Sequence, residues 1–202
     1  LTTFTINSKP MDLVQPKREG YTFEGWSGTD IKEKDTQVTV TARPLKDRTY
    51  TANWKENSYT IVFNVEGEVT RGEMKNIPLR YTQETTIPKN GYVCGGYKFV
   101  GWRTGGKKSE QKVYQPGDKV SRLCATNNGT VNLYPIWEPC EYTITFDYQT
   151  GNKREKVTCK YKETYTFPTV NRLGWTFEGW SRSAGSTNVI SYAPNVKTAV
   201  FE

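Results

Sequence analysis

The chain has 202 residues, of which 35% are apolar and 13% aromatic, and its formal net charge is +7. The apolar share is low for a globular domain, so a few large rings must supply much of each core. The basic residues are spread without a dense Lys/Arg run, which argues against a specific nucleic-acid partner. No run approaches the roughly 18 apolar residues of a membrane span, so we expect no membrane insertion.

One short phrase recurs three times, with the pattern Gly-aromatic-x-Phe-x-Gly-Trp. The copies span 20–26, 96–102 and 174–180, so their closing tryptophans lie 76 and 78 positions apart. A period of this size indicates repeated small domains rather than one large core. We therefore divide the chain into three segments. These are the C-terminal part of a module (1–56), a complete module (57–139), and the N-terminal and central part of a further module (140–202).

The first segment carries its phrase after a proline approach and closes with a strand-like run over 49–54. In each phrase the first glycine suits a turn with positive φ, and the second lets the chain bend before the tryptophan. Residues that recur in every copy are expected to build the module rather than to bind a ligand. On this ground we interpret eight rings as core anchors: Phe23, Trp26, Trp54, Phe99, Trp102, Trp137, Phe177 and Trp180.

The middle segment opens at 59–64 with strict alternation of large apolar and polar residues, which is typical of a strand with one buried face. An insertion at 93–96 runs into its phrase and shares Gly96 with it, and the segment closes with a strand over 131–137. No segment of the chain shows a sustained helical period. The predicted class is therefore mainly β with a minor α+β component.

The third segment opens with a predicted hairpin, in which strands 142–147 and 154–161 flank a turn. We expect Tyr142 to oppose Val157, which places Cys140 opposite Cys159. The segment ends with Phe201 at the position of the closing tryptophan. The outward face of the second strand is basic and is a candidate ligand patch, comprising Arg154, Lys156, Lys160 and Lys162. A solvated face that discourages edge pairing explains these residues equally well.

Four cysteines without a C-x-x-C pair argue against a zinc site. We predict two disulfides, Cys94–Cys124 in the middle segment and Cys140–Cys159 across the hairpin. The alternative is four buried free thiols in a reducing or anaerobic setting.

The sequence contains no histidine, which removes the usual general base and the commonest transition-metal ligand. Paired carboxylates remain possible for glycoside hydrolysis, but the acidic residues are scattered. No phosphate-binding loop is present. We therefore expect no enzyme, no catalytic or metal-binding residue and no cofactor.

The strand, proline approach, repeated phrase and closing Tyr-x-x-x-Trp of this chain together resemble the Listeria–Bacteroides repeat, or InlB B-repeat, family. The resemblance covers essentially the whole chain, and the insertion at 93–96 and the cysteines depart from its pattern. It implies tandem β-grasp-like modules, arranged as beads on a string, in a secreted or wall-attached bacterial protein. The implied role is an adhesive module or a stalk that contacts an unidentified host or cell-surface protein or glycan. We also expect neighbouring repeats in a longer parent chain.

A carbohydrate-binding module is the alternative function, because exposed aromatic rings stack on sugars. Four tyrosines outside the repeated phrase are the candidates for such stacking: Tyr92, Tyr114, Tyr148 and Tyr192.

Overall fold

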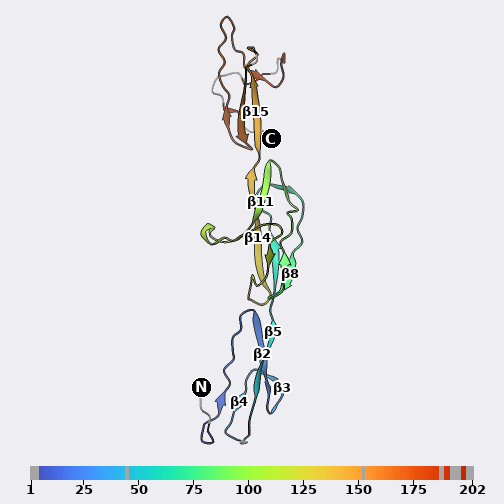
Figure 1. Ribbon diagram of the computed structural model, residues 1–202, viewed down its shortest axis with the longest axis vertical. Helices are drawn as coiled ribbons and strands as arrows, with labels where there is room; N and C mark the ends of the chain where they lie inside the picture. Colours follow the sequence, from blue (N-terminus) through green and yellow to red (C-terminus); the bar gives the residue numbers. More distant parts are fainter. Residues whose placement is uncertain (1–4, 44–45, 152, 187–188, 192–196, 199–202) are drawn as a thin grey trace. The chain divides into compact units, whose positions relative to one another are not determined.

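The computed structural model describes residues 5–43, 46–151, 153–186, 189–191 and 197–198 (Figure 1). The regular elements of these residues are β-strands and a single 3-10 turn, η1 (Lys108–Glu110). The mainly β class is confirmed, and the described part of the chain contains no α-helix. None of it forms a helix long and apolar enough to cross a membrane.

The chain forms two compact units. The first comprises Leu1–Glu66, Gly72–Tyr92 and Gly101–Pro135, and the second comprises Gly67–Arg71, Val93–Val100 and Ile136–Glu202.

The first segment of the chain builds a small antiparallel sheet in the first unit. The sheet has the order β3-β2-β5, and two short strands, β1 and β4, pair beside it. The bounds are β1 (Met11–Asp12), β2 (Tyr21–Gly28), β3 (Ile31–Asp35), β4 (Thr39–Val40) and β5 (Tyr50–Glu56).

An irregularity in strand β2 explains the spacing of the repeated phrase. Phe23 pairs with Trp54 while Gly25 pairs with Asn53, so one extra residue, Glu24, is accommodated on β2 as in a β-bulge. Gly25 has a φ of 121°, and a Cβ there would lie 2.9 Å from the backbone of Asp35. Because of the extra residue, rings three positions apart share one face, where those of Phe23 and Trp26 meet edge to face at 5.4 Å.

The middle segment forms a five-stranded sheet with the order β12-β11-β14-β6-β8 (Figure 1). In chain order, β6 is the first strand of this segment and β14 is the last. Strand β6 runs parallel to β14 and antiparallel to β8. A further short pair, β9 with β13, lies outside this sheet. The bounds are β6 (Ser58–Phe63), β8 (Ile77–Arg80), β9 (Thr85–Thr86), β11 (Tyr97–Thr104), β12 (Val113–Tyr114), β13 (Lys119–Val120) and β14 (Gly129–Pro139).

The core of the first unit centres on Trp102, which is fully buried. Its ring meets that of Phe63 at 4.8 Å and that of Tyr92 at 6.2 Å, both edge to face. Tyr59 and Ile61 complete the buried face of β6, as the alternation in the sequence predicts.

The second unit contains the hairpin of the third segment and three further two-stranded pairs, namely β7 with β10, β17 with β20 and β18 with β19. Phe146, Phe167 and Cys159 are buried there, and the ring of Trp180 meets that of Phe146 at 4.8 Å. The bounds are β7 (Val69–Arg71), β10 (Val93–Cys94), β15 (Glu141–Asp147), β16 (Arg154–Lys160), β17 (Tyr165–Thr166), β18 (Trp180–Ser181), β19 (Val189–Ser191) and β20 (Lys197–Thr198).

The predicted register of the hairpin is wrong by two residues. Tyr142 pairs with Cys159 and Ile144 with Val157 in strands β15 and β16. A shift of two residues keeps the same side chains on the inner face, so the hydrophobic pattern does not distinguish the two registers.

Candidate functional site

The most distinctive site in the first unit lies where the first segment joins the middle one. Gly20 has a φ of 75°, and the ring of Tyr81 packs directly on it. A Cβ at position 20 would lie 2.0 Å from Cδ1 of Tyr81, so only glycine fits. The neighbouring ring of Tyr21 meets that of Tyr81 edge to face at 6.3 Å.

The residue that links these two segments, Asn57, is held on both sides. Its backbone N–H donates to the carbonyl of Gly20 (2.9 Å), and its carbonyl accepts from the N–H of Tyr81 (2.9 Å). Its side-chain amide donates to the carbonyl of Ala125 (2.7 Å) and accepts from the hydroxyl of Thr22 (2.5 Å). Asn57 is a buried polar residue, and these bonds satisfy the donor and acceptor that burial removes from water.

The carboxylates of Glu56 and Glu19 lie close to this first joint. Glu56 accepts from both the backbone N–H and the hydroxyl of Thr82, and these bonds lower the pKa of its carboxyl group. Burial, together with the nearby charge of Glu19, raises the pKa of the Tyr81 phenol. Both groups are therefore held in the protonation state that they have at neutral pH.

The second joint, within the second unit, has the same geometry. Gly96 has a φ of 73°, and a Cβ there would lie 2.4 Å from the ring of Tyr161. The rings of Tyr97 and Tyr161 meet edge to face at 5.2 Å. Cys140 takes the place of Asn57, since its N–H donates to the carbonyl of Gly96 and its carbonyl accepts from the N–H of Tyr161, both at 2.8 Å.

An ion pair is specific to the second joint. Lys162, directly after Tyr161, donates to the carboxylate of Glu68, and this bond raises the pKa of the lysine. Both side chains are solvent-accessible, so the pair contributes little to the free energy of folding.

Of the joint residues only Cys140 was predicted as a site residue, and it was predicted to form a disulfide. The repeated Gly-Tyr pair was recognised as a turn, but its partners, Tyr81 and Tyr161, lie more than 60 positions away in the sequence. One signal was available, because each tyrosine directly follows a basic residue, Arg80 at the end of β8 and Lys160 at the end of β16. Asn57 and Cys140 likewise both precede an opening Tyr-Thr-Ile run by two positions.

The eight rings interpreted as core anchors lie in aromatic clusters. Phe23 contacts both Trp26 and Trp54, and ring pairs at 5.6–5.7 Å join Phe99 to Trp137 and Phe177 to Trp180. Trp102 is fully buried and the other seven are partly buried.

The two predicted disulfides are wrong, since all four cysteines are free thiols. Cys94 and Cys159 are buried, and burial raises the pKa of each thiol. Cys140 lies just before strand β15, where the true register places Tyr142 rather than Cys140 opposite Cys159. Cys124 is half-buried, next to Gly129.

The basic strand face is exposed but partly neutralised. Arg154 pairs with Asp147 across the hairpin at 2.9 Å, and Lys162 pairs with Glu68. Among the described residues, Lys156 and Lys160 form no ion pair. The four side chains therefore present two unpaired charges rather than four.

Three of the four tyrosines proposed for sugar stacking lie among the described residues, and none of these three is exposed. Tyr92 is buried and its hydroxyl donates to the carbonyl of Phe63 (2.9 Å). Tyr114 and Tyr148 are half-buried, and Tyr192 lies outside the described residues. Among the described residues, the rings that are exposed are those of Tyr142 and Trp175.

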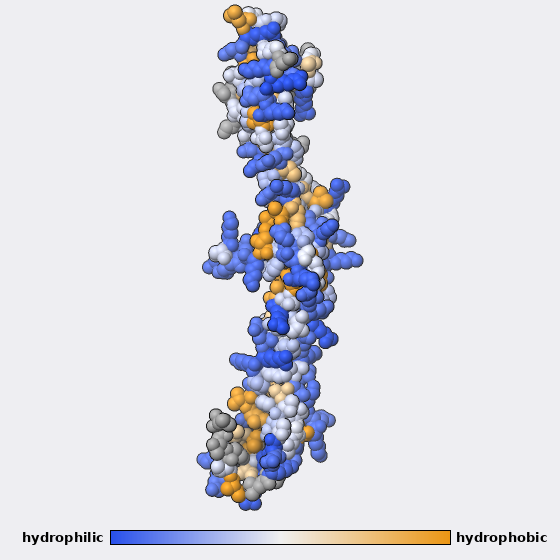
Figure 2. Space-filling view, viewed as in Figure 1, coloured by the Kyte–Doolittle hydropathy of each residue, from blue (hydrophilic) through white to orange (hydrophobic). Residues whose placement is uncertain are grey.

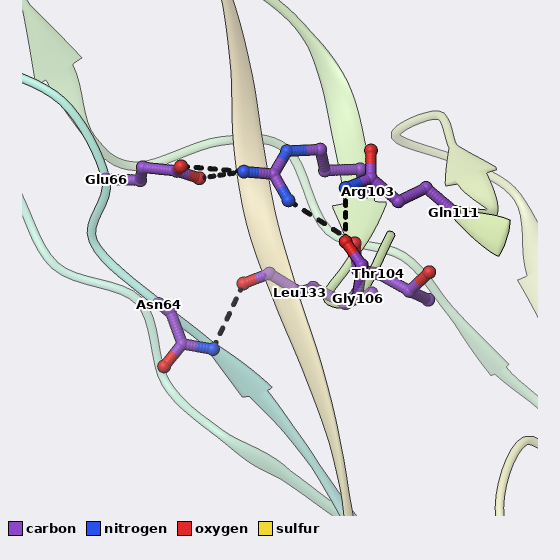
Figure 3. A network of polar contacts seen from close by, with 7 residues as sticks. All are labelled: Asn64, Glu66, Arg103, Thr104, Gly106, Gln111 and Leu133. Carbon is purple, nitrogen blue, oxygen red and sulfur yellow. Dashed lines mark hydrogen bonds and ion pairs between the residues drawn. The ribbon is translucent and has the colours of Figure 1, made fainter. Parts of the chain in front are cut away.

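A polar network lies beside the loop that follows the second phrase (Figure 3). Arg103 on β11 donates to both carboxylate oxygens of Glu66 (2.7 and 2.5 Å), and its guanidinium lies 5.2 Å from the centre of the Tyr134 ring. Gln111 closes the neighbouring loop by donating to the carbonyl of Gly106 (3.0 Å). The positive charge of Arg103 is thus paired within the unit.

The visible surface offers neither a large apolar patch nor a metal centre. Figure 2 shows hydrophobic side chains in small, separate patches among hydrophilic ones on the viewed face. Within the described ranges, no group of three or more Cys, Asp or Glu side chains is placed to hold a metal ion.

The described residues thus form a β architecture in which the same joint geometry occurs twice. The model of the Listeria-Bacteroides repeat domain matches residues 59–134 and 142–200, and that of the divergent InlB B-repeat domain matches residues 16–58. The chain therefore belongs to the Listeria–Bacteroides repeat family, and the resemblance seen in the sequence is confirmed.

Three relatives place this segment in longer proteins. A putative Gly-rich membrane protein of Evansella cellulosilytica is 26% identical over 95% of this chain, and a putative membrane protein of the same organism is 25% identical over 90%. Internalin H of Listeria monocytogenes is 32% identical over 53% of the chain. The matches span 24%, 26% and 19% of these proteins, respectively. No solved structure matches significantly.

Proposed function

We propose that this chain is a non-catalytic spacer in a bacterial surface protein, in which tandem β-grasp-like modules are connected by tyrosine-on-glycine joints. The joint carries the proposal, because the same contact recurs between Gly20 and Tyr81 and between Gly96 and Tyr161. A spacer requires the same structural contact at each joint. It requires no common binding surface, and the surfaces around the two joints differ. The parallel pairing of β6 with β14 supports the β-grasp-like assignment.

The location at the cell surface rests on the relatives, whose names include two putative membrane proteins and an internalin. In this role the partners of the chain are its neighbouring repeats. An adhesive contact through the basic strand face is less favoured, because Arg154 and Lys162 are already paired.

Two experiments test the spacer. In the first, single chains are stretched from their ends, and the double variant Tyr81→Ala/Tyr161→Ala is compared with the unaltered chain. We expect the variant to extend further at low force, before any module unfolds, because its joints bend freely. Equal low-force extension would contradict the proposal.

The second experiment asks whether the chain binds anything on its own. The labelled chain is applied to a glycan array and to host-cell surfaces at low and high salt. A spacer gives no saturable binding. Saturable, salt-insensitive sugar binding would favour a carbohydrate-binding module, and saturable binding to cells would favour an adhesin.

A further inference from the structure

The third copy of the repeated phrase forms the same turn as the first. The N–H of Trp175 donates to the carbonyl of Arg172 (3.0 Å), as the N–H of Tyr21 does to that of Arg18 (3.1 Å). The φ of Gly174 is 76°, against 75° at Gly20. Each arginine also lies over the ring that closes its turn, at 4.6 Å for Trp175 and 3.8 Å for Tyr21.

This third turn differs from the other two in being uncovered. At Gly20 and Gly96 a tyrosine ring occupies the space where a Cβ would lie, whereas no described residue lies within 4 Å of that point at Gly174. Trp175 is 68% exposed and Leu173 is fully exposed. Leu173 and Trp175 are thus exposed apolar residues on either side of Gly174, and within the described ranges no ring covers this glycine.

The two covered turns show what fits on such a surface. In both, the partner is the tyrosine that directly follows β8 or β16, the strand that pairs antiparallel with its segment's opening strand, together with the residue that precedes that opening strand. The tyrosine lies on the glycine and meets the neighbouring ring edge to face. Trp175 offers a larger ring than Tyr21 or Tyr97 for this contact, and Leu173 replaces the acidic Glu19 with an apolar neighbour.

We propose that Gly174 and Trp175 form the docking surface for the opening hairpin of a further repeat module, whose tyrosine packs on Gly174 as Tyr81 packs on Gly20. This inference rests on the proposed spacer function, since it extends the same joint by one module. The occupant is a module of this family with a tyrosine at that position.

The test extends the full chain after Glu202 with a copy of residues 56–137. Because Phe201 aligns with Trp54, the position after Glu202 corresponds to residue 56, so the appended copy starts in register with the repeat. Hydroxyl-radical footprinting then measures the labelling rate of Trp175. We expect labelling to fall severalfold in the extended chain and to recover when the appended copy of Tyr81 is replaced by alanine. Protection of the appended copy of Trp102 shows that the added module has folded.

Unchanged labelling of Trp175 beside a folded appended module would overturn the inference. The existing joint separates this outcome from failure of the spacer proposal. If Tyr81→Ala exposes Tyr21 to labelling while Trp175 stays exposed in the extended chain, the joint is real and only the third docking surface is refuted. If Tyr81→Ala leaves Tyr21 unchanged, the joint itself fails.

Discussion

Tyr81 packs so closely on Gly20 that any side chain at position 20 would overlap its ring. The glycine therefore meets two requirements at once, a left-handed backbone and the absence of a Cβ. The same pair of requirements recurs at Gly96 beneath Tyr161.

Gly20→Ala separates these two requirements when it is compared with Gly174→Ala. Both glycines have nearly the same φ, but only Gly20 lies under a ring. We expect Gly174→Ala to cost about 1–2 kcal/mol of unfolding free energy from the left-handed backbone. Gly20→Ala should cost about 1–3 kcal/mol more from overpacking. Urea unfolding followed by fluorescence measures both, and equal losses would contradict the packing seen at Gly20.

Replacing Asn57 with alanine removes the amide that bridges Thr22 and Ala125. Two groups lose their partners at a buried position, so we expect a loss of about 1–3 kcal/mol in unfolding free energy. The control is Asn132→Ala, because Asn132 is exposed and accepts a single long bond from Asn64 (3.2 Å). Thermal denaturation compares the two variants, and an equal effect would show that the bridge does not stabilise the joint.

The four thiols should all react when the chain is unfolded and alkylated without reductant. Mass spectrometry then counts four adducts, and a species with two adducts missing would reveal a disulfide. In the folded chain Cys124 and Cys140 should react before the buried Cys94 and Cys159. Burial raises the pKa of the latter two thiols, so less thiolate is present at a given pH and their reaction needs a more alkaline solution.

Tyr148 should titrate at unusually high pH. Its hydroxyl donates to the carboxylate of Glu155 at 2.6 Å, and this bond, with lesser effects of burial and charge, raises its pKa from 10 to about 12. The neutral phenol is thus favoured in the folded chain. Its stabilising effect is complete below the unfolded pKa of 10 and is lost as the pH rises through 12.

The measurement is the phenolate absorbance of the chain minus that of Tyr148→Phe. Glu155→Gln should return the titration of Tyr148 towards its ordinary pH, because the charged acceptor is removed. A titration unaffected by Glu155→Gln would contradict the hydrogen bond.

Local patterns in the sequence predicted the strands well. The alternation over 59–64 corresponds to strand β6, whose Tyr59, Ile61 and Phe63 are buried. The hairpin of the third segment was recognised, but its register was not, because two registers that differ by two residues bury the same side chains. The prediction of a Cys140–Cys159 disulfide failed with that register.

By itself the sequence determined the repeat, the mainly β class and the family, since all three depend on residue types at fixed short spacings. Only the tertiary structure decided which ring covers which glycine. Tyr81 and Gly20 are 61 positions apart, and no local pattern specifies a contact between side chains that distant strands bring together. The first glycine of each phrase is predicted from the sequence to be a turn residue, and in the folded chain Gly20 and Gly96 also lie directly under a tyrosine ring.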